Sequence, residues 1–264
     1  MVQDFIFDGK ALSDFGYVAV MENQEDTMPV SAMQFETIKS ALSDISHRVA
    51  YNYESNYTST LLIMKNPCEF YDEDSYLTND DIAELTRWLA RKQYKWFRYI
   101  DDDDDDEIWY QVQFVINKEF VGDKVIGLQL TINCNAPYGF TREFNTETTD
   151  NSIMVRPNTD EEGYIYPTMI ITCSGGDAKI TNTTTGEETI VKNCAADEVI
   201  TFSGADLQQV SSSVTDHDLS EDFIMYRFPR FAILYGNNAN ELSFENISNV
   251  QISYRGIRKV GLDG

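Results

Sequence analysis

Apolar and polar residues alternate along much of this chain, a pattern typical of strands with one buried face. The clearest case is residues 108–116, where Trp109, Gln111 and Gln113 alternate with apolar neighbours. Residues 96–100 have the same aromatic and β-branched character. The pattern therefore predicts a β-hairpin made of residues 96–100 and 108–116, with an acidic loop between the two strands.

Further strands are predicted throughout the first half of the chain. An Asp8-Gly9 turn follows an apolar run and precedes a second strand from Tyr17 to Met21. Three later runs also have strand character, namely residues 47–53, 57–65 and 124–134. Residues 22–46 are polar with few apolar positions, so we expect a long loop or an extended arm there.

One segment has helical rather than strand periodicity. Its apolar positions recur every three or four residues, at Ile82, Leu85, Trp88 and Leu89. Thr78 is a favourable N-cap residue, with Asp81 three positions later. This spacing predicts a helix over residues 79–94, with Trp88 as an anchor in the core.

The second half of the chain predicts a separate β domain. Residues 141–163 are the polar stretch most like an interdomain connection, after a first domain of residues 1–140, and a short strand is possible at residues 153–155. Residues 164–264 contain eight short strand patterns separated by Gly and Asn turns, among them residues 164–173 and 178–182, then 188–193 and 198–204. Such regular spacing favours a β-sandwich or jelly roll without helices.

Charge narrows the possible functions. The chain carries 44 acidic and 20 basic residues, a net charge of −24. A surface of this sign repels phosphate, so direct binding of nucleic acid is not expected. The hydrophobic share of 42% is enough for folded cores. We expect no membrane insertion, because no apolar run approaches the ~18 residues that a span requires.

Residues that could support catalysis or metal binding are sparse. Cys68, Cys134, Cys173 and Cys194 form no CxxC pair and have no histidine at ligand spacing, so we interpret them as buried free thiols. His47 and His217 lie near no nucleophile motif, and the segment around His217 is interpreted as a solvated loop. We therefore expect no enzyme, no cofactor and no dedicated metal site.

The most unusual feature is a run of six aspartates at the tip of the predicted hairpin, Asp101, Asp102, Asp103, Asp104, Asp105 and Asp106. Counted as a calcium loop, its sixth position is Asp106 rather than Gly, and its twelfth is Val112 rather than Glu. A calcium site, a mimic of DNA, a loop that repels DNA and a solvated loop without a role remain open.

The order of these segments resembles the distal tail proteins of long-tailed bacteriophages. The resemblance rests on "FDGKALSDFGYVAV", "ELTRWLARKQYKWFRYID" with the following "IWYQVQF", "GLQLTINCNAPYGF", and the closing "FPRFAILYGNNANELSFENISNVQISYR". It spans nearly the whole chain. The resemblance implies an N-terminal β-barrel with one flanking helix, similar to tail-tube proteins, and a C-terminal galectin-like sandwich. Residues 22–46 depart from the commoner pattern, which has a glycine-rich turn there.

The resemblance also implies a structural role in the virion. Six copies would form a ring that joins the tail tube protein to a tip or fibre protein, and a receptor-binding protein could dock there. Genomic DNA would pass through the lumen without specific binding, and Asp101 to Asp106 would line that lumen. The protein would be made in the host bacterial cytoplasm. The alternative is a carbohydrate-binding module that contacts the host envelope, although residues 164–264 contain no tryptophan.

Overall fold

The fold divides into two compact units. The structure is a computed structural model that describes residues 2–21, 33–39, 45–53, 56–68, 75–100, 107–204, 208–233 and 239–260. One unit comprises Met1–Phe140 with Arg258–Gly264, and the other comprises Thr141–Ile257. Each has its own hydrophobic core. The prediction of a mainly β protein is confirmed, and no helix in the described residues is long and apolar enough to cross a bilayer.

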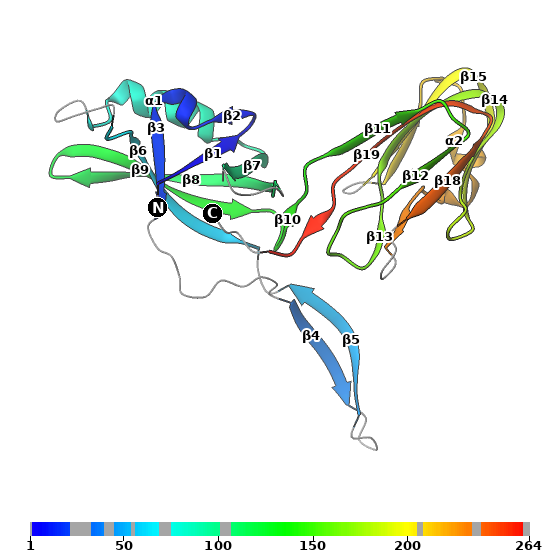
Figure 1. The fold of residues 1–264 in the computed structure, drawn as a ribbon, viewed down its shortest axis with the longest axis horizontal. Coiled ribbons are helices and arrows are strands. Elements are labelled where there is room, and N and C mark those ends of the chain that lie inside the picture. The colour runs from blue at the N-terminus through cyan, green and yellow to red at the C-terminus, as the bar shows by residue number, and fades with distance from the viewer. Residues whose placement is uncertain are drawn as a thin grey trace. The chain divides into compact units, whose positions relative to one another are not determined.

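The first unit is a closed antiparallel barrel. Its six strands follow one another around the barrel in the order β1 (Val2–Phe7), β3 (Tyr17–Met21), β6 (Thr58–Lys65), β9 (Lys124–Cys134), β8 (Tyr110–Val121) and β7 (Lys95–Ile100). Pairing of β1 with β7 closes the ring (Figure 1). A turn at Asp8 and Gly9, both with positive φ, leads from β1 to the short strand β2 (Lys10–Ala11). A 3-10 turn, η1 (Ser13–Phe15), leads on to β3.

The predicted hairpin around the aspartates has strands β7 and β8. Phe97 pairs with Tyr110 and Trp96 with Gln111. Along β8, Tyr110 and Val112 are buried whereas the alternating Gln111 is half-buried, as expected for a strand with one face in the core. The hydrophobic pattern therefore identified both the strands and their pairing.

Helix α1 (Asn79–Leu89) packs against the barrel. Thr78 and Asp81 form a reciprocal capping box at its N-terminus. Trp88 is 4% exposed, so the prediction of a core anchor is confirmed. The helix ends at Leu89, five residues before the predicted end at residue 94. The remaining residues turn the chain back into β7, and the Lys92 carbonyl accepts a hydrogen bond from Gln113 Nε2 at 2.9 Å.

A separate two-stranded sheet contains one strand from the stretch predicted to be a loop or arm and one from the strand predicted at residues 47–53, which is confirmed. It pairs β4 (Met33–Lys39) with β5 (Ser46–Tyr53). Of the two alternatives, a loop or an extended arm, the loop is wrong for residues 33–39, because they form a strand in which Glu36 pairs with Ala50. The guanidinium of Arg48 lies 5.6 Å from the centre of the Phe35 ring.

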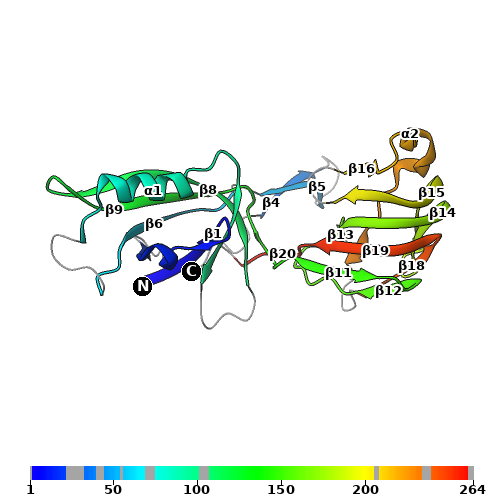
Figure 2. The ribbon, with the colours of Figure 1, turned by 90° about the horizontal axis from the view of Figure 1, so that it is seen from above.

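The second unit is a β-sandwich. One layer contains, in spatial order, β11 (Phe144–Thr148), β19 (Ile247–Tyr254), β14 (Thr168–Asn182), β15 (Glu187–Ser203) and β16 (Gln209–Ser212), as Figure 2 shows. The other layer adds β12 (Ser152–Val155) and β18 (Asn240–Glu245), which pairs with the far half of β14. Alternate residues of these strands point into the shared core.

Strands β14 and β15 belong to both layers because they bend. The sequence predicts two separate strands in each of these stretches, and that prediction is wrong. Each is continuous, with register shifts between Thr172 and Ser174 and between Gly176 and Ala178. Gly175 and Gly176 have φ of 99° and 88°. The glycines therefore bend the hairpin and do not end it.

The predicted connection at residues 141–163 contains two strands of the sandwich, β11 and β12, and the first residue of β13 (Gly163–Ile165). The short strand predicted at residues 153–155 corresponds to β12 and is confirmed. β13 pairs with β17 (Phe231–Ile233) and β10 (Gly139–Phe140) pairs with β20 (Ile257–Arg258). A single helical turn, α2 (Leu219–Asp222), followed by η3 (Ile224–Tyr226), lies where no helix was predicted.

Candidate functional site

The aspartate run lies outside the described residues, from Asp101 to Asp106. Its flanks are described: β7 ends at Ile100, and Glu107 begins the next described stretch. Arg98 on β7 lies 3.5 Å from Glu107 Oε1, and its guanidinium is 5.5 Å from the centre of the Trp109 ring. The acidic segment therefore joins two antiparallel neighbours in the barrel wall.

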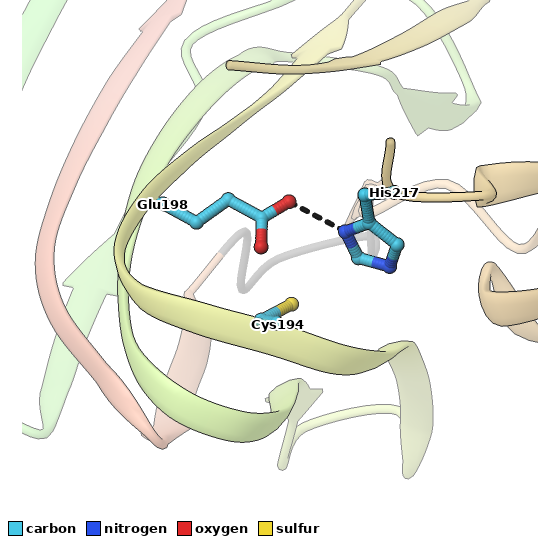
Figure 3. Close-up of side chains that lie close together, drawn as sticks. All are labelled: Cys194, Glu198 and His217. Carbon is cyan, nitrogen blue, oxygen red and sulfur yellow. Dashed lines mark hydrogen bonds and ion pairs between the residues drawn. The ribbon is translucent and has the colours of Figure 1, made fainter. Parts of the chain in front are cut away.

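A thiol, a carboxylate and an imidazole lie close together at the bend of the β14–β15 hairpin. Cys194 and Glu198 lie four residues apart on β15, on either side of Asp197, which has φ of 62°. His217 comes from the segment between β16 and α2. The ligand atoms of these three residues lie within 4.8 Å of one another (Figure 3). We refer to Cys194, Glu198 and His217 as the bend cluster.

The Glu198 carboxylate is the centre of the bend cluster. Glu198 is 2% exposed, yet its oxygens are well satisfied. Oε1 accepts hydrogen bonds from Ser212 Oγ and His217 Nδ1, each at 2.5 Å, and Oε2 accepts one from the Ala195 N–H at 2.7 Å. Burial opposes ionisation, but these hydrogen bonds outweigh it and lower the pKa of Glu198. The group is therefore a buried carboxylate anion.

The imidazole of His217 lies between two carboxylates. Its side chain is 5% exposed; Nδ1 faces Glu198, and Nε2 lies 3.3 Å from Asp222 Oδ2 without the alignment of a hydrogen bond. Burial disfavours the imidazolium, but the hydrogen bond and charge of Glu198 outweigh it and raise the pKa of His217. Asp222 is held in turn by Asn193 Nδ2 at 2.8 Å.

Two cysteines from neighbouring strands meet beside this pair. Cys173 on β14 and Cys194 on β15 are both buried free thiols, so the prediction of buried thiols is confirmed for them and for Cys134, whereas Cys68 is exposed. A hydrogen bond from the Cys173 thiol lowers the pKa of Cys194 and raises the pKa of Cys173. Of the two, Cys194 is the one that favours the thiolate.

Sequence reasoning missed the bend cluster. The loop around His217 is mostly exposed, as predicted, but the His217 side chain points inward, so its interpretation as part of a solvated loop is wrong. Glu198 was one of 44 acidic residues without distinguishing context. No ligand spacing along the chain could reveal the cluster, because His217 follows Cys194 by 23 positions and only the fold of β15 and β16 brings them together.

The outer face of the sandwich offers a second candidate site. A hollow on β11, β19 and β14 is lined by Asn145, Thr146, Glu147, Thr168, Ile170, Gln251, Ile252 and Ser253. Glu147 accepts hydrogen bonds from Asn249 Nδ2 at 2.7 Å and Gln251 Nε2 at 3.2 Å, and they lower its pKa. These described residues present amides, hydroxyls and a carboxylate, and none of the lining residues is aromatic.

Residues 1–136 match a protein family described as a phage tail protein N-terminal domain, and residues 138–254 match its companion, a phage tail C-terminal domain. The chain belongs to this family of phage tail proteins. As a member, it is a component of the phage tail. No curated protein matches the sequence.

Solved structures of phage hub and baseplate proteins share the fold of this phage tail protein. One is the SPP1 Dit protein (gp 19.1), described as a paradigm of the hub adsorption apparatus in phages that infect Gram-positive hosts. It has a TM-score of 0.62 and 12% identity, covering 97% of this chain and 99% of that chain. A chain of the phage P2 baseplate, in its activated conformation with Ca, has a TM-score of 0.53 and 10% identity over 97% and 98% of the two chains. The fold agreement covers both units of the chain.

Proposed function

We propose that this phage tail protein forms a hexameric ring that joins the tail tube to the tail-tip complex and lets genomic DNA pass through its lumen. The observation that carries the proposal is the agreement of fold, over 97% of the chain, with a hub protein of an adsorption apparatus. In this role the partners are further copies of the chain, the tail tube protein, a tip or fibre protein and a receptor-binding protein. The sandwich then serves as a docking platform.

Exposed apolar side chains support the assembly into a ring. The β4–β5 hairpin is a two-stranded sheet that exposes Phe35, Ile38 and Val49 by 56%, 61% and 55%. Such hairpins are only marginally stable alone in water, and exposed apolar groups of this size mark contact surfaces. We infer that a neighbouring subunit covers this hairpin. The barrel itself is closed by β1–β7 pairing, so its strands offer little free edge for assembly.

The test of the ring is the oligomeric state of the full chain. Sedimentation and negative-stain electron microscopy should reveal rings of six copies. The double substitution Phe35→Ser with Ile38→Ser should shift the population toward monomers. Met154→Ser is the matched control, because Met154 is 57% exposed on β12 of the other unit and should leave the rings intact. A full chain that stays monomeric at high concentration would overturn the proposal.

The barrel unit should carry the ring contacts. We expect residues 1–140 to be sufficient for ring formation, since they contain both the barrel strands and the β4–β5 hairpin. A fragment of residues 1–140 that is folded by circular dichroism but monomeric, under conditions in which the full chain forms rings, would show that the sandwich contributes essential contacts.

A carbohydrate-binding module is the second candidate function. The hollow lined by Asn145, Glu147 and Gln251 favours it, because amides and carboxylates hydrogen-bond sugar hydroxyls. The absence of an aromatic residue from the lining weighs against it, since sugar sites commonly stack a ring. A glycan array with the full chain separates the two functions. Specific binding that Glu147→Ala abolishes, while rings persist, would establish the sugar site in addition to the ring.

A further inference from the structure

Three side chains of types that commonly bind metals lie together at the bend of the β14–β15 hairpin. A thiol, a carboxylate and an imidazole, from Cys194, Glu198 and His217, have their ligand atoms within 4.8 Å of one another. Figure 3 shows the Cys194 sulfur beside the carboxylate of Glu198, which faces the ring of His217. Sulfur, nitrogen and oxygen donors of these types are the set that Zn²⁺ takes in proteins.

The carboxylates in and beside the bend cluster favour binding of a cation. Glu198 and Asp222 are two carboxylates around a single imidazole. Unpaired charge is costly to bury. One Zn²⁺ would balance the charges of a Cys194 thiolate and the Glu198 carboxylate, with His217 neutral.

The surroundings of His217 are those of a metal ligand. A histidine that binds a metal through one ring nitrogen usually presents the other to a carboxylate. Here Nδ1 faces the bend cluster, whereas the buried Nε2 lies 3.3 Å from Asp222 Oδ2 and lacks an aligned hydrogen bond. Asn193 Nδ2 in turn holds Asp222 Oδ1 at 2.8 Å. This arrangement fixes the ring with Nδ1 directed at Glu198.

We propose that the bend cluster is a zinc site, in which Cys194 Sγ, Glu198 and His217 Nδ1 bind one Zn²⁺ per chain and the fourth tetrahedral position is left to a water molecule. Binding replaces the thiol proton of Cys194 and any proton on Nδ1, and both leave to solvent. Ligand atoms around tetrahedral zinc lie about 3.3–3.8 Å apart, so Nδ1 and Oε1 separate by about 1 Å to admit the ion. The Cys173 thiol then donates its hydrogen bond to the metal-bound sulfur.

A bound zinc ion would hold two segments of the sandwich together. Cys194 and Glu198 belong to β15, whereas His217 belongs to the segment that leads into α2, so the ion ties this segment to the bend of the hairpin. A thiolate ligand selects zinc over calcium and magnesium, which prefer oxygen donors. Cys194, Glu198 and the His217 side chain are each exposed by 5% or less, so the ion would have little contact with bulk solvent.

The experiment uses the full chain, stripped with a chelator and then titrated with ZnCl₂ or CoCl₂ alone. We expect one Zn²⁺ per chain with a dissociation constant in the micromolar range or below, a zinc-dependent rise in the melting temperature of the sandwich, and a thiolate-to-cobalt charge-transfer band. Cys194→Ser and His217→Gln should each remove the band and weaken zinc binding at least tenfold. Cys68→Ser and His47→Gln, outside the cluster, should leave both unchanged.

Several outcomes would overturn the proposal. They are zinc binding weaker than millimolar in the folded wild-type chain, equal zinc affinity in Cys194→Ser, and a Cys173–Cys194 disulfide, detected as two missing thiols under denaturing conditions. Circular dichroism of each stripped variant establishes folding. If a variant does not fold, the spectrum of the cobalt-loaded wild-type chain still tests the proposal. A spectrum without the thiolate-to-cobalt band would contradict ligation by Cys194.

Discussion

At the scale of single residues, Trp88 shows how one side chain joins the helix to the barrel. Its ring stacks on Phe15 with centroids 4.6 Å apart, and Nε1 donates a hydrogen bond to the Phe7 carbonyl at 3.1 Å. Trp88→Ala should lower the free energy of unfolding by about 3–5 kcal/mol, because it empties a packed site. Trp88→Phe, which keeps most of the packing, should cost about 1–2 kcal/mol. Denaturant unfolding measures both, and a loss under about 1 kcal/mol for Trp88→Ala would contradict the packing role.

The pair Glu187 and Arg230 gives the sandwich a pH dependence. Arg230 Nε donates to Glu187 Oε2 at 2.9 Å, and its Nη2 donates to Oε1 of the same carboxylate. The hydrogen bonds from Arg230 lower the pKa of Glu187. A lowered folded-state pKa means that the stabilisation is present above the unfolded value of 4.5 and is lost as the pH falls through the folded value.

Glu187→Gln should therefore destabilise the protein by about 1–2 kcal/mol at pH 7. The difference from wild type should shrink as the pH falls through the lowered pKa of Glu187, because the wild-type carboxylate is then protonated as well. Urea titrations at a series of pH values measure this difference. A penalty that is the same at pH 3 and pH 7 would mean that packing, and not charge, makes the contact.

At the scale of elements, the bend in β14 and β15 is the feature on which the second unit depends. Gly175 has φ of 99°, which an L side chain adopts only with strain. Gly175→Ala should lower the free energy of unfolding by about 1–2 kcal/mol. Asp197, exposed at φ of 62°, is the matched position where glycine is compatible, so Asp197→Gly should change stability by less than about 0.5 kcal/mol. Thermal unfolding of both variants checks the contrast, and a neutral Gly175→Ala would show that the bend tolerates a side chain.

At the scale of the whole molecule, the charge of −24 matters because the proposed ring surrounds DNA. Like charge in the lumen keeps phosphate from settling at any site. Asp101 to Asp106 are our candidates for that lining. Replacing all six with Ser and Asn should leave folding and ring formation intact, since adjacent like charges contribute no attraction. Assembled virions should then eject DNA more slowly, as measured by dye release after receptor addition.

Replacing six exposed acidic residues elsewhere in the chain gives the control for the aspartate run. Such a variant has the same net charge and should eject DNA at the wild-type rate. Equal ejection rates in all three proteins would contradict a lumenal role for the run. A melting temperature that rises with calcium in the wild type alone would instead support a metal site in the aspartates.

Local periodicity in the sequence was enough to predict several elements of the fold. Alternation predicted the strands of the β7–β8 hairpin, and the spacing from Ile82 to Leu89 with the Thr78 cap predicted α1, because each pattern records which face of the element is buried. The order of the segments also identified the family of tail proteins. These features need only neighbours in the chain.

Contacts between segments that are distant in the chain could not be predicted from local patterns. The end of α1 at Leu89 and the continuity of β14 through Gly175 depend on pairing partners that the local sequence does not contain. The bend cluster is the clearest example, since Cys194 and His217 are brought together by the pairing of β15 with β16. Non-local pairing buries side chains without any fixed spacing, so the sequence can name the residue types but not the site they form.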